Sequence, residues 1–170
     1  MAKKEISYDN ALSRCATLCA RAEHSRFELM RKMRQWGANG TVIEKVIETL
    51  EDGGFIDEER FAHAFVNDKY RFDGWGRIKI RYSLRQQGIA DNLIAEAMNE
   101  IDGEEYEEIL SRLLKAKHRM VAGRDPYKQK DALVRYAASR GFELSLVSRM
   151  VASLVAGADD FEVDDVETDV

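Results

Sequence analysis

Three segments of the sequence repeat one pattern of apolar residues around a glycine. The glycines are Gly37, Gly88 and Gly141, which stand 51 and 53 positions apart. After each glycine the same apolar positions return, and after the first they are Val42, Ile43, Ile47 and Leu50. Spacings of three and four residues put apolar side chains on one helix face, and glycine readily takes the left-handed conformation that closes a helix. Each segment therefore predicts a helix, a glycine-closed turn and a second helix.

A further helix precedes each of these pairs, so the repeating unit has three helices. We predict these first helices over residues 10–21, 58–71 and 106–120. The predicted modules are 1–56, 57–102 and 103–156, separated at Gly53-Gly54 and Asp102-Gly103 and followed by an acidic tail, 157–170, that we expect to be disordered. Because the chain has a single proline and its modules need only touch end to end, we predict an all-α fold: an elongated, curved array of three tandem three-helix modules.

Local chemistry predicts where several helices begin. Ser25 and Thr41 are each followed three positions later by glutamate, which fits a capping box. Asp125 precedes the proline, a residue suited to the first turn of a helix. Asp57 and Asp91 are further candidate N-caps.

The formal net charge of −5 hides an asymmetry along the chain. The last thirteen residues, ADDFEVDDVETDV, contain seven carboxylates and no basic residue, and without those seven the net charge is +2. A mildly basic body with an acidic tail often accompanies nucleic-acid or nucleoprotein binding. A tail that only improves solubility is the interpretation we favour for the tail taken alone; a tail that mimics DNA or restrains a basic surface is the alternative.

The sequence offers no set of residues for catalysis, metal binding or a cofactor. Cys15 and Cys19 lie four positions apart, on one face of a predicted helix, which favours reduced, buried thiols. The three histidines, His24, His63 and His118, are scattered one per module without the spacing of metal ligands. We therefore predict a non-enzymatic protein without cofactor or metal.

No membrane segment is expected. No apolar run approaches the roughly 18 residues that a spanning helix needs, and the first residues lack the apolar core of a secretory signal. We expect a cytoplasmic protein that does not bind membranes.

The best candidate for a binding surface is a basic segment in the second module. It contains Arg71, Arg77, Lys79, Arg81 and Arg85. Positions 77, 81 and 85 are four apart, so their side chains form one stripe on a helix. Such a stripe can contact DNA phosphates or an acidic strip on a protein partner. A solvated helix face is an equally weighted alternative.

Related positions in the other modules are partly basic. Arg26 and Lys130 match Arg77, and Arg34 matches Arg85, which favours a shared surface. A second basic group in the third module could continue it, and comprises Arg112, Lys115, Lys117, Arg119 and Arg124.

Aromatic residues flank the basic segment of the second module. Tyr70, Phe72 and Trp75 can stack on bases or anchor a protein interface. They can also be core residues at a module joint, the interpretation we favour for Phe72. Gly74-Trp75-Gly76 lacks the further residues of a phosphate-binding loop, and we interpret it as a turn.

Several of these motifs together resemble the RecX family of recombination regulators. The resemblance rests on Ala11-Leu12 with Ser25 and Glu28-Leu29, on GFIDEERFA at residues 54–62, and on RFDGWGRIKIRYSLRQQG at residues 71–88. It implies tandem three-helix modules and a protein that binds the helical groove of the RecA–DNA filament. It further implies that the protein hampers strand exchange, ATP hydrolysis and coprotease action, and that it binds single- or double-stranded DNA weakly. We expect a monomer.

Two other functions remain open from the residues alone. The second helix pair of each module could act as a helix-turn-helix that binds DNA directly, although +2 is a low charge for such a protein. The modules could also serve as a scaffold for another helical partner.

Overall fold

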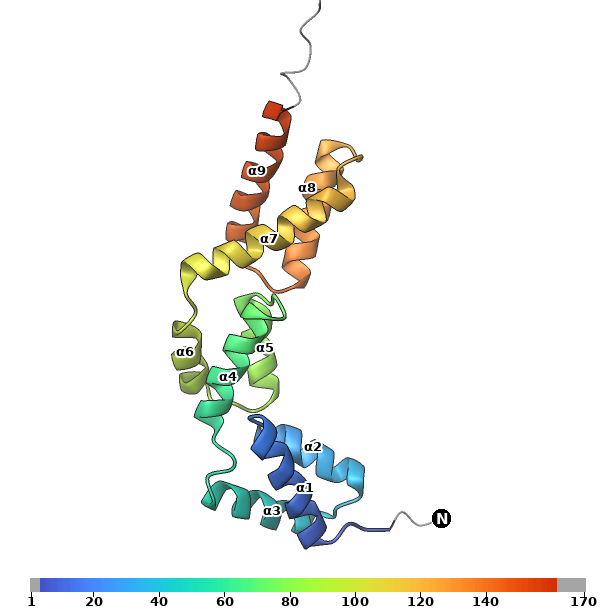
Figure 1. Ribbon diagram of the computed structural model, residues 1–170, viewed down its shortest axis with the longest axis vertical. Helices are drawn as coiled ribbons and strands as arrows, with labels where there is room; N and C mark the ends of the chain where they lie inside the picture. The colour runs from blue at the N-terminus through green and yellow to red at the C-terminus, as the bar shows by residue number, and fades with distance from the viewer. Residues whose placement is uncertain (1–3, 162–170) are drawn as a thin grey trace, which may run out of the picture. The chain divides into compact units, whose positions relative to one another are not determined.

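The protein is all-helical over the residues that its computed structural model describes, 4–161 (Figure 1). The helices are α1 (Tyr8–Arg21), α2 (Arg26–Trp36), α3 (Gly40–Asp52), α4 (Glu58–Arg71), α5 (Arg77–Gln86), α6 (Asp91–Asn99), α7 (Gly103–Val121), α8 (Pro126–Ser139) and α9 (Leu144–Phe161). The all-α prediction is confirmed, and the helices follow the tandem three-helix pattern. Two helices begin earlier than predicted: α1 starts two residues before its predicted position and α7 three residues before.

The three glycine-closed turns have one geometry. Gly37, Gly88 and Gly141 all take positive φ values, of 89°, 73° and 90°. In each turn the N–H of the residue after glycine donates to a carbonyl five positions earlier, at Met33, Leu84 and Ala137. This is the bond of a Schellman ending. The repeat predicted from the sequence is thus a repeat of the same hydrogen bonds.

Three of the predicted N-caps are confirmed and two are wrong. Ser25, Asp57 and Asp125 are confirmed, since each accepts the N–H three residues ahead. Thr41 was the wrong cap: it lies inside α3, and Asn39 caps that helix by accepting from the Val42 N–H at 2.9 Å. Asp91 was also wrong, because α6 has no side-chain cap and this carboxylate instead pairs with an arginine.

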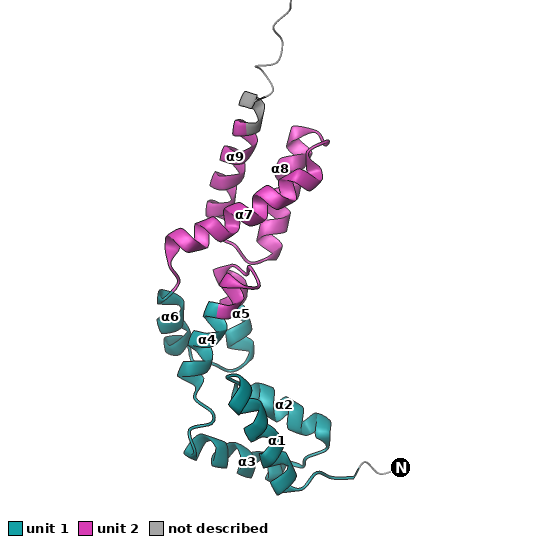
Figure 2. Ribbon diagram, in the orientation of Figure 1, with its two compact units in different colours: residues 1–67, 82–100 teal, residues 68–81, 101–170 magenta. Residues whose placement is uncertain are grey.

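The described residues group into two compact units (Figure 2), of residues 1–67 with 82–100 and of residues 68–81 with 101–170. The division runs through α4 and α5. Of the helices in the second predicted module, α4 and α5 contribute to both units and α6 belongs to the first. The three-module division of the sequence remains our proposal.

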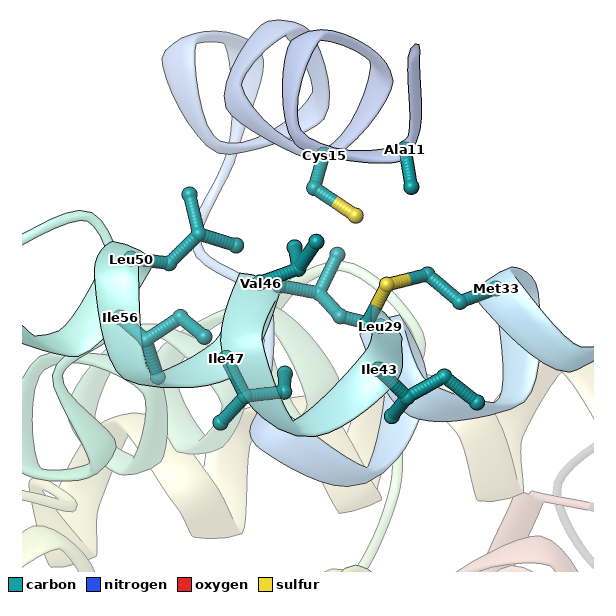
Figure 3. Packing of buried hydrophobic residues seen from close by; sticks show 9 residues of the cluster. All are labelled: Ala11, Cys15, Leu29, Met33, Ile43, Val46, Ile47, Leu50 and Ile56. Carbon is teal, nitrogen blue, oxygen red and sulfur yellow. The ribbon is translucent and has the colours of Figure 1, made fainter. Parts of the chain in front are cut away.

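In the first unit, α3 packs against α1 and α2 around a core of buried hydrophobic residues. Figure 3 shows Ala11 and Cys15 of α1 directed toward Val46 and the side chains of α2. Burial raises the pKa of the Cys15 thiol to about 11, with a smaller contribution from Cys19. Both cysteines are free; Cys15 is buried, as predicted, whereas Cys19 is only half-buried.

Polar contacts join the first three helices to the rest of the first unit. The Ser25 hydroxyl is fully buried and donates to the Gln87 amide oxygen at 2.8 Å. Arg60 in the GFIDEERFA segment donates to Glu23 at 3.0 Å and to the Gly54 carbonyl at 2.9 Å. A guanidinium with several donors suits this joint, because it satisfies a carboxylate and a backbone carbonyl together.

In the second unit, α7, α8 and α9 all pack against one another. Tyr106, Leu110, Leu114, Leu133 and Phe142 are buried there. Helix α9 continues to Phe161, so helix covers the first five residues of the predicted disordered tail. The remaining residues of that tail, 162–170, lie outside the described residues.

Candidate functional site

The three arginines of the predicted stripe lie on α5 in three different environments. Arg77 is half-buried and pairs with Glu143 at 3.3 Å. Arg85 is exposed and pairs with Asp91 at 3.0 Å. Arg81 is exposed and has no ion-pair or hydrogen-bond partner for its side chain among the described residues. Of the three, Arg81 is the cation that is open to a partner.

Arg77 belongs to a small network around Tyr106. Its guanidinium carbon lies 4.0 Å from the centre of the Tyr106 ring. The Tyr106 oxygen accepts from the Arg77 backbone N–H at 3.0 Å and donates to Glu143 at 2.8 Å. Burial, ahead of any charge effect, raises the pKa of the Tyr106 hydroxyl, which therefore stays a neutral donor. The network satisfies every polar group that it buries.

Backbone hydrogen bonds fasten the start of α5 to the turn between α8 and α9. The Gly76 N–H donates to the Arg140 carbonyl at 2.8 Å, and the Ile78 N–H donates to the Gly141 carbonyl at 3.0 Å. A helix start leaves its first N–H groups without partners inside the helix. Here the carbonyls of Arg140 and Gly141 accept from two N–H groups at this start. A Cβ on Gly76 would overlap the backbone of Gly141 and Phe142. The Gly-Trp-Gly segment lies in the connection between α4 and α5, and its backbone contacts the turn between α8 and α9.

The remaining basic residues of this segment also have partners within the second unit. Arg71 pairs with Glu105 at 3.1 Å, and the buried Tyr70 donates to the same carboxylate at 3.0 Å. Hydrogen bonding from Arg71 is the main cause that lowers the pKa of Glu105. Lys79 lies over the Trp75 ring, 4.3 Å from its centre. These side chains make contacts within the second unit and are therefore less available to a binding partner.

The aromatic residues fall opposite to our expectation at one position. Phe72, which we favoured as a core residue, is 82% exposed, whereas Tyr70 is fully buried. Trp75 is half-buried between Lys69 and Lys79. Tyr70 and Phe72 differ in burial because Tyr70 lies on the inner face at the end of α4, whereas Phe72 follows the last residue of that helix.

The predicted basic positions of the other modules also differ among themselves. Arg26 pairs with Glu51, while Arg34 and Lys130 are exposed and have no side-chain partner among the described residues. The second basic group lies on α7 and the α7–α8 turn, and Arg112, Lys115, Arg119 and Arg124 are exposed there.

The exposed face of α5 combines apolar and basic side chains. Ile78 is 53% exposed and Tyr82 is 64% exposed, and they share this face with Arg81 and Arg85. Because α5 is one continuous helix, positions 78, 81, 82 and 85 fall on one stripe. Tyrosine and arginine together are enriched where interfaces gain most of their binding energy. The sequence prediction missed Ile78 and Tyr82; their three- and four-residue spacing from the arginines was the available signal.

Among the residues that the structure describes, no cluster of histidine, cysteine and carboxylate side chains could hold a metal. His24 lies beside Glu28, His63 beside Glu100 and His118 beside Gln129. None of the helices within the described range is long and apolar enough to cross a membrane.

Comparison with known proteins places these features in a family. Residues 11–50 match the family model of the first three-helix domain of RecX, and residues 57–98 match that of its second three-helix domain. The regulatory protein RecX of Pseudomonas savastanoi pv. phaseolicola is 33% identical over 145 residues, which cover 84% of this chain and 89% of that protein. The chain belongs to the RecX family. The regulatory protein RecX of Chlorobium phaeobacteroides is 34% identical over 126 residues, covering 74% of this chain and 81% of the relative.

Solved RecX structures share the fold. A crystal structure of regulatory protein RecX superposes with a TM-score of 0.74 at 20% identity, covering 86% of this chain and 73% of that chain. RecX from Lactobacillus salivarius gives 0.69 at 16% identity, covering 86% and 96%. The RecX relatives are named as regulatory proteins, which agrees with a non-enzymatic role. Tyr106, Arg140 and Glu143 lie beyond the residues that match the two RecX domain models.

Proposed function

We propose that this protein regulates RecA by binding the RecA–DNA filament, and that it thereby hampers strand exchange, ATP hydrolysis and coprotease activity. Membership of the RecX family supports the regulatory role. The observation that supports a protein contact is the exposed face of α5, where Ile78, Arg81 and Tyr82 stand together. An apolar and aromatic surface with an unpaired arginine suits an acidic, partly apolar strip on a protein better than it suits phosphate alone.

Contacts from more than one module support binding that does not depend on any single arginine. Exposed, unpaired cations lie in both units, at Arg34 in the first and at Arg81 and Lys130 in the second. Several modest contacts to a repeating filament add through effective concentration. Weak binding of the protein to single- or double-stranded DNA is part of the same proposal.

The test is RecA's single-stranded-DNA-dependent ATP hydrolysis, measured with increasing amounts of this protein. We expect inhibition at levels well below that of RecA. Changing Arg81→Glu together with Tyr82→Ser should raise the concentration for half-inhibition about tenfold or more, because both side chains are exposed and central to the proposed surface.

The matched control is Lys45→Glu, which reverses an exposed, unpaired lysine on α3. It should leave the inhibition within about twofold of wild type, as expected for a surface change outside an interface. Inhibition that appears only when the protein coats the DNA would instead favour simple competition for DNA. No inhibition at any level would refute the proposed function and leave the fold standing.

A further inference from the structure

Half of the residues that line a groove between α7 and α8 in the second unit are basic. Its volume is about 730 Å³. The lining residues are Lys117, Arg124, Lys128, Asp131, Ala132, Arg135, Tyr136 and Ser139. One helix, the turn that follows it and the next helix thus place four basic side chains around a single hollow.

Most of this positive charge is uncompensated. Asp131 is the carboxylate among the lining residues, and it pairs with Arg135 at 3.1 Å. Lys117, Arg124 and Lys128 have no ion-pair partner within the described part of the chain. Asp125 stands at the start of α8 and is engaged as its N-cap. Three arginines elsewhere in the unit, Arg71, Arg77 and Arg149, each pair with a glutamate, whereas three of the four cations that line this groove are unpaired.

Aromatic rings accompany the cations. The Lys117 ammonium lies 5.5 Å from the centre of the Tyr136 ring, which lines the groove. Tyr127 lies outside the groove's lining, precedes Lys128 in the first turn of α8, and is 78% exposed. Unpaired cations beside aromatic faces are the chemistry with which proteins hold single-stranded nucleic acid without reading its sequence, because phosphates meet the cations and bases stack on the rings.

We infer that the α7–α8 groove binds the sugar-phosphate backbone of single-stranded nucleic acid, with Lys117, Arg124 and Lys128 on the phosphates and Tyr127 as a stacking face. The inference deepens the DNA-binding part of the proposed function and rests on it, but it needs no RecA. An acidic peptide would satisfy the cations equally, yet it would leave the exposed tyrosine without a role.

The experiment measures binding of the full-length protein to a fluorescein-labelled oligo(dT) by fluorescence anisotropy over a range of salt, without RecA. Arg124→Glu combined with Lys128→Glu should weaken binding about tenfold or more at low salt. It should also reduce the slope of log Kd against log salt by about 1.4, which is 0.7 for each phosphate contact on a single strand. Tyr127→Ala should weaken binding several-fold with the slope unchanged.

The matched control is Arg112→Glu with Arg119→Glu, two exposed, unpaired cations of α7 that do not line the groove. The control should keep the wild-type slope. Equal losses of slope in both double variants would overturn the inference, because a general field effect would then explain the binding. It would also be overturned if poly-glutamate bound in a groove-dependent way while oligo(dT) binding ignored the groove.

The same variants separate this inference from the proposed function. The groove variant should bind oligo(dT) poorly and still inhibit RecA, whereas the Arg81 and Tyr82 variant should show the reverse. Groove-dependent DNA binding by a protein that never inhibits RecA would refute the proposed function and leave the groove intact.

Discussion

At the scale of single residues, charge alone did not reveal which arginines are available to a partner. Arg77 and Arg81 lie one helical turn apart, and the sequence pattern predicts the same exposed stripe for both. The structure pairs Arg77 with Glu143 and Tyr106 and leaves Arg81 in solvent. The difference arises because the Arg77 partners come from positions 29 and 66 residues away, which no local pattern can indicate.

Tyr106 tests the importance of this network, because one hydroxyl satisfies two groups. Tyr106→Phe keeps the ring against Phe142 but leaves the Arg77 N–H and the Glu143 carboxylate each without one hydrogen bond. We expect a loss of about 1–3 kcal/mol in the free energy of unfolding, the usual cost of leaving buried polar groups unsatisfied. Urea unfolding would measure this loss as a lower midpoint with an unchanged m value.

Tyr127→Phe is the control for that substitution. The Tyr127 hydroxyl is exposed and makes no hydrogen bond with the described residues, so the free energy of unfolding should stay the same within about 0.5 kcal/mol. An equal effect of the two changes would contradict the role given to Tyr106.

At the scale of helices and turns, the sequence predicted what depends on local order. The apolar spacing located α4 to the residue, and the glycines marked three turns with one geometry. It failed at α3, where Thr41 and Asn39 both fit a cap and only the backbone decides between them. It also missed that carbonyls of the turn between α8 and α9 accept from N–H groups at the start of α5, because Gly76 has no side chain to signal a contact.

The docking of α5 gives a prediction at this scale. Gly76→Ala adds a methyl group where the backbone of Gly141 and Phe142 already lies, so the two turns must separate. Overpacking of this kind costs about 1–3 kcal/mol or more. We expect a lower urea midpoint, together with faster hydrogen exchange at the Gly76 and Ile78 N–H groups, whose acceptors lie across the contact.

Gly103→Ala provides the comparison within the same unit. Gly103 begins α7, and a Cβ there meets nothing within 4 Å. Alanine in place of glycine should be neutral or stabilising by up to about 1 kcal/mol. Destabilisation by Gly103→Ala as large as that by Gly76→Ala would show that the close approach is not the cause.

At the scale of the whole molecule, the distribution of charge matters more than its sum. The net charge is −5, yet the α7–α8 groove holds three unpaired cations, and the last nine residues contain five carboxylates without a basic residue. Like charges on a protein and on DNA repel over distances set by the salt concentration. The acidic end of the chain should therefore weaken DNA binding whatever structure it takes.

Truncation after Phe161 removes those five carboxylates, brings the net charge from −5 to 0, and leaves α9 complete. We expect oligo(dT) to bind about two- to tenfold more tightly at low salt. The gain should disappear toward 1 M salt, where the Debye screening length falls to about 3 Å. Replacing the five carboxylates by amides in the full-length chain should reproduce the gain, since charge and not length is the cause.

If the segment occupies the groove, truncation should give little gain in affinity in the Arg124→Glu, Lys128→Glu variant, whereas a general field effect would give the same gain in both backgrounds. Unchanged affinity in both altered chains would leave solubility as the role of the acidic residues.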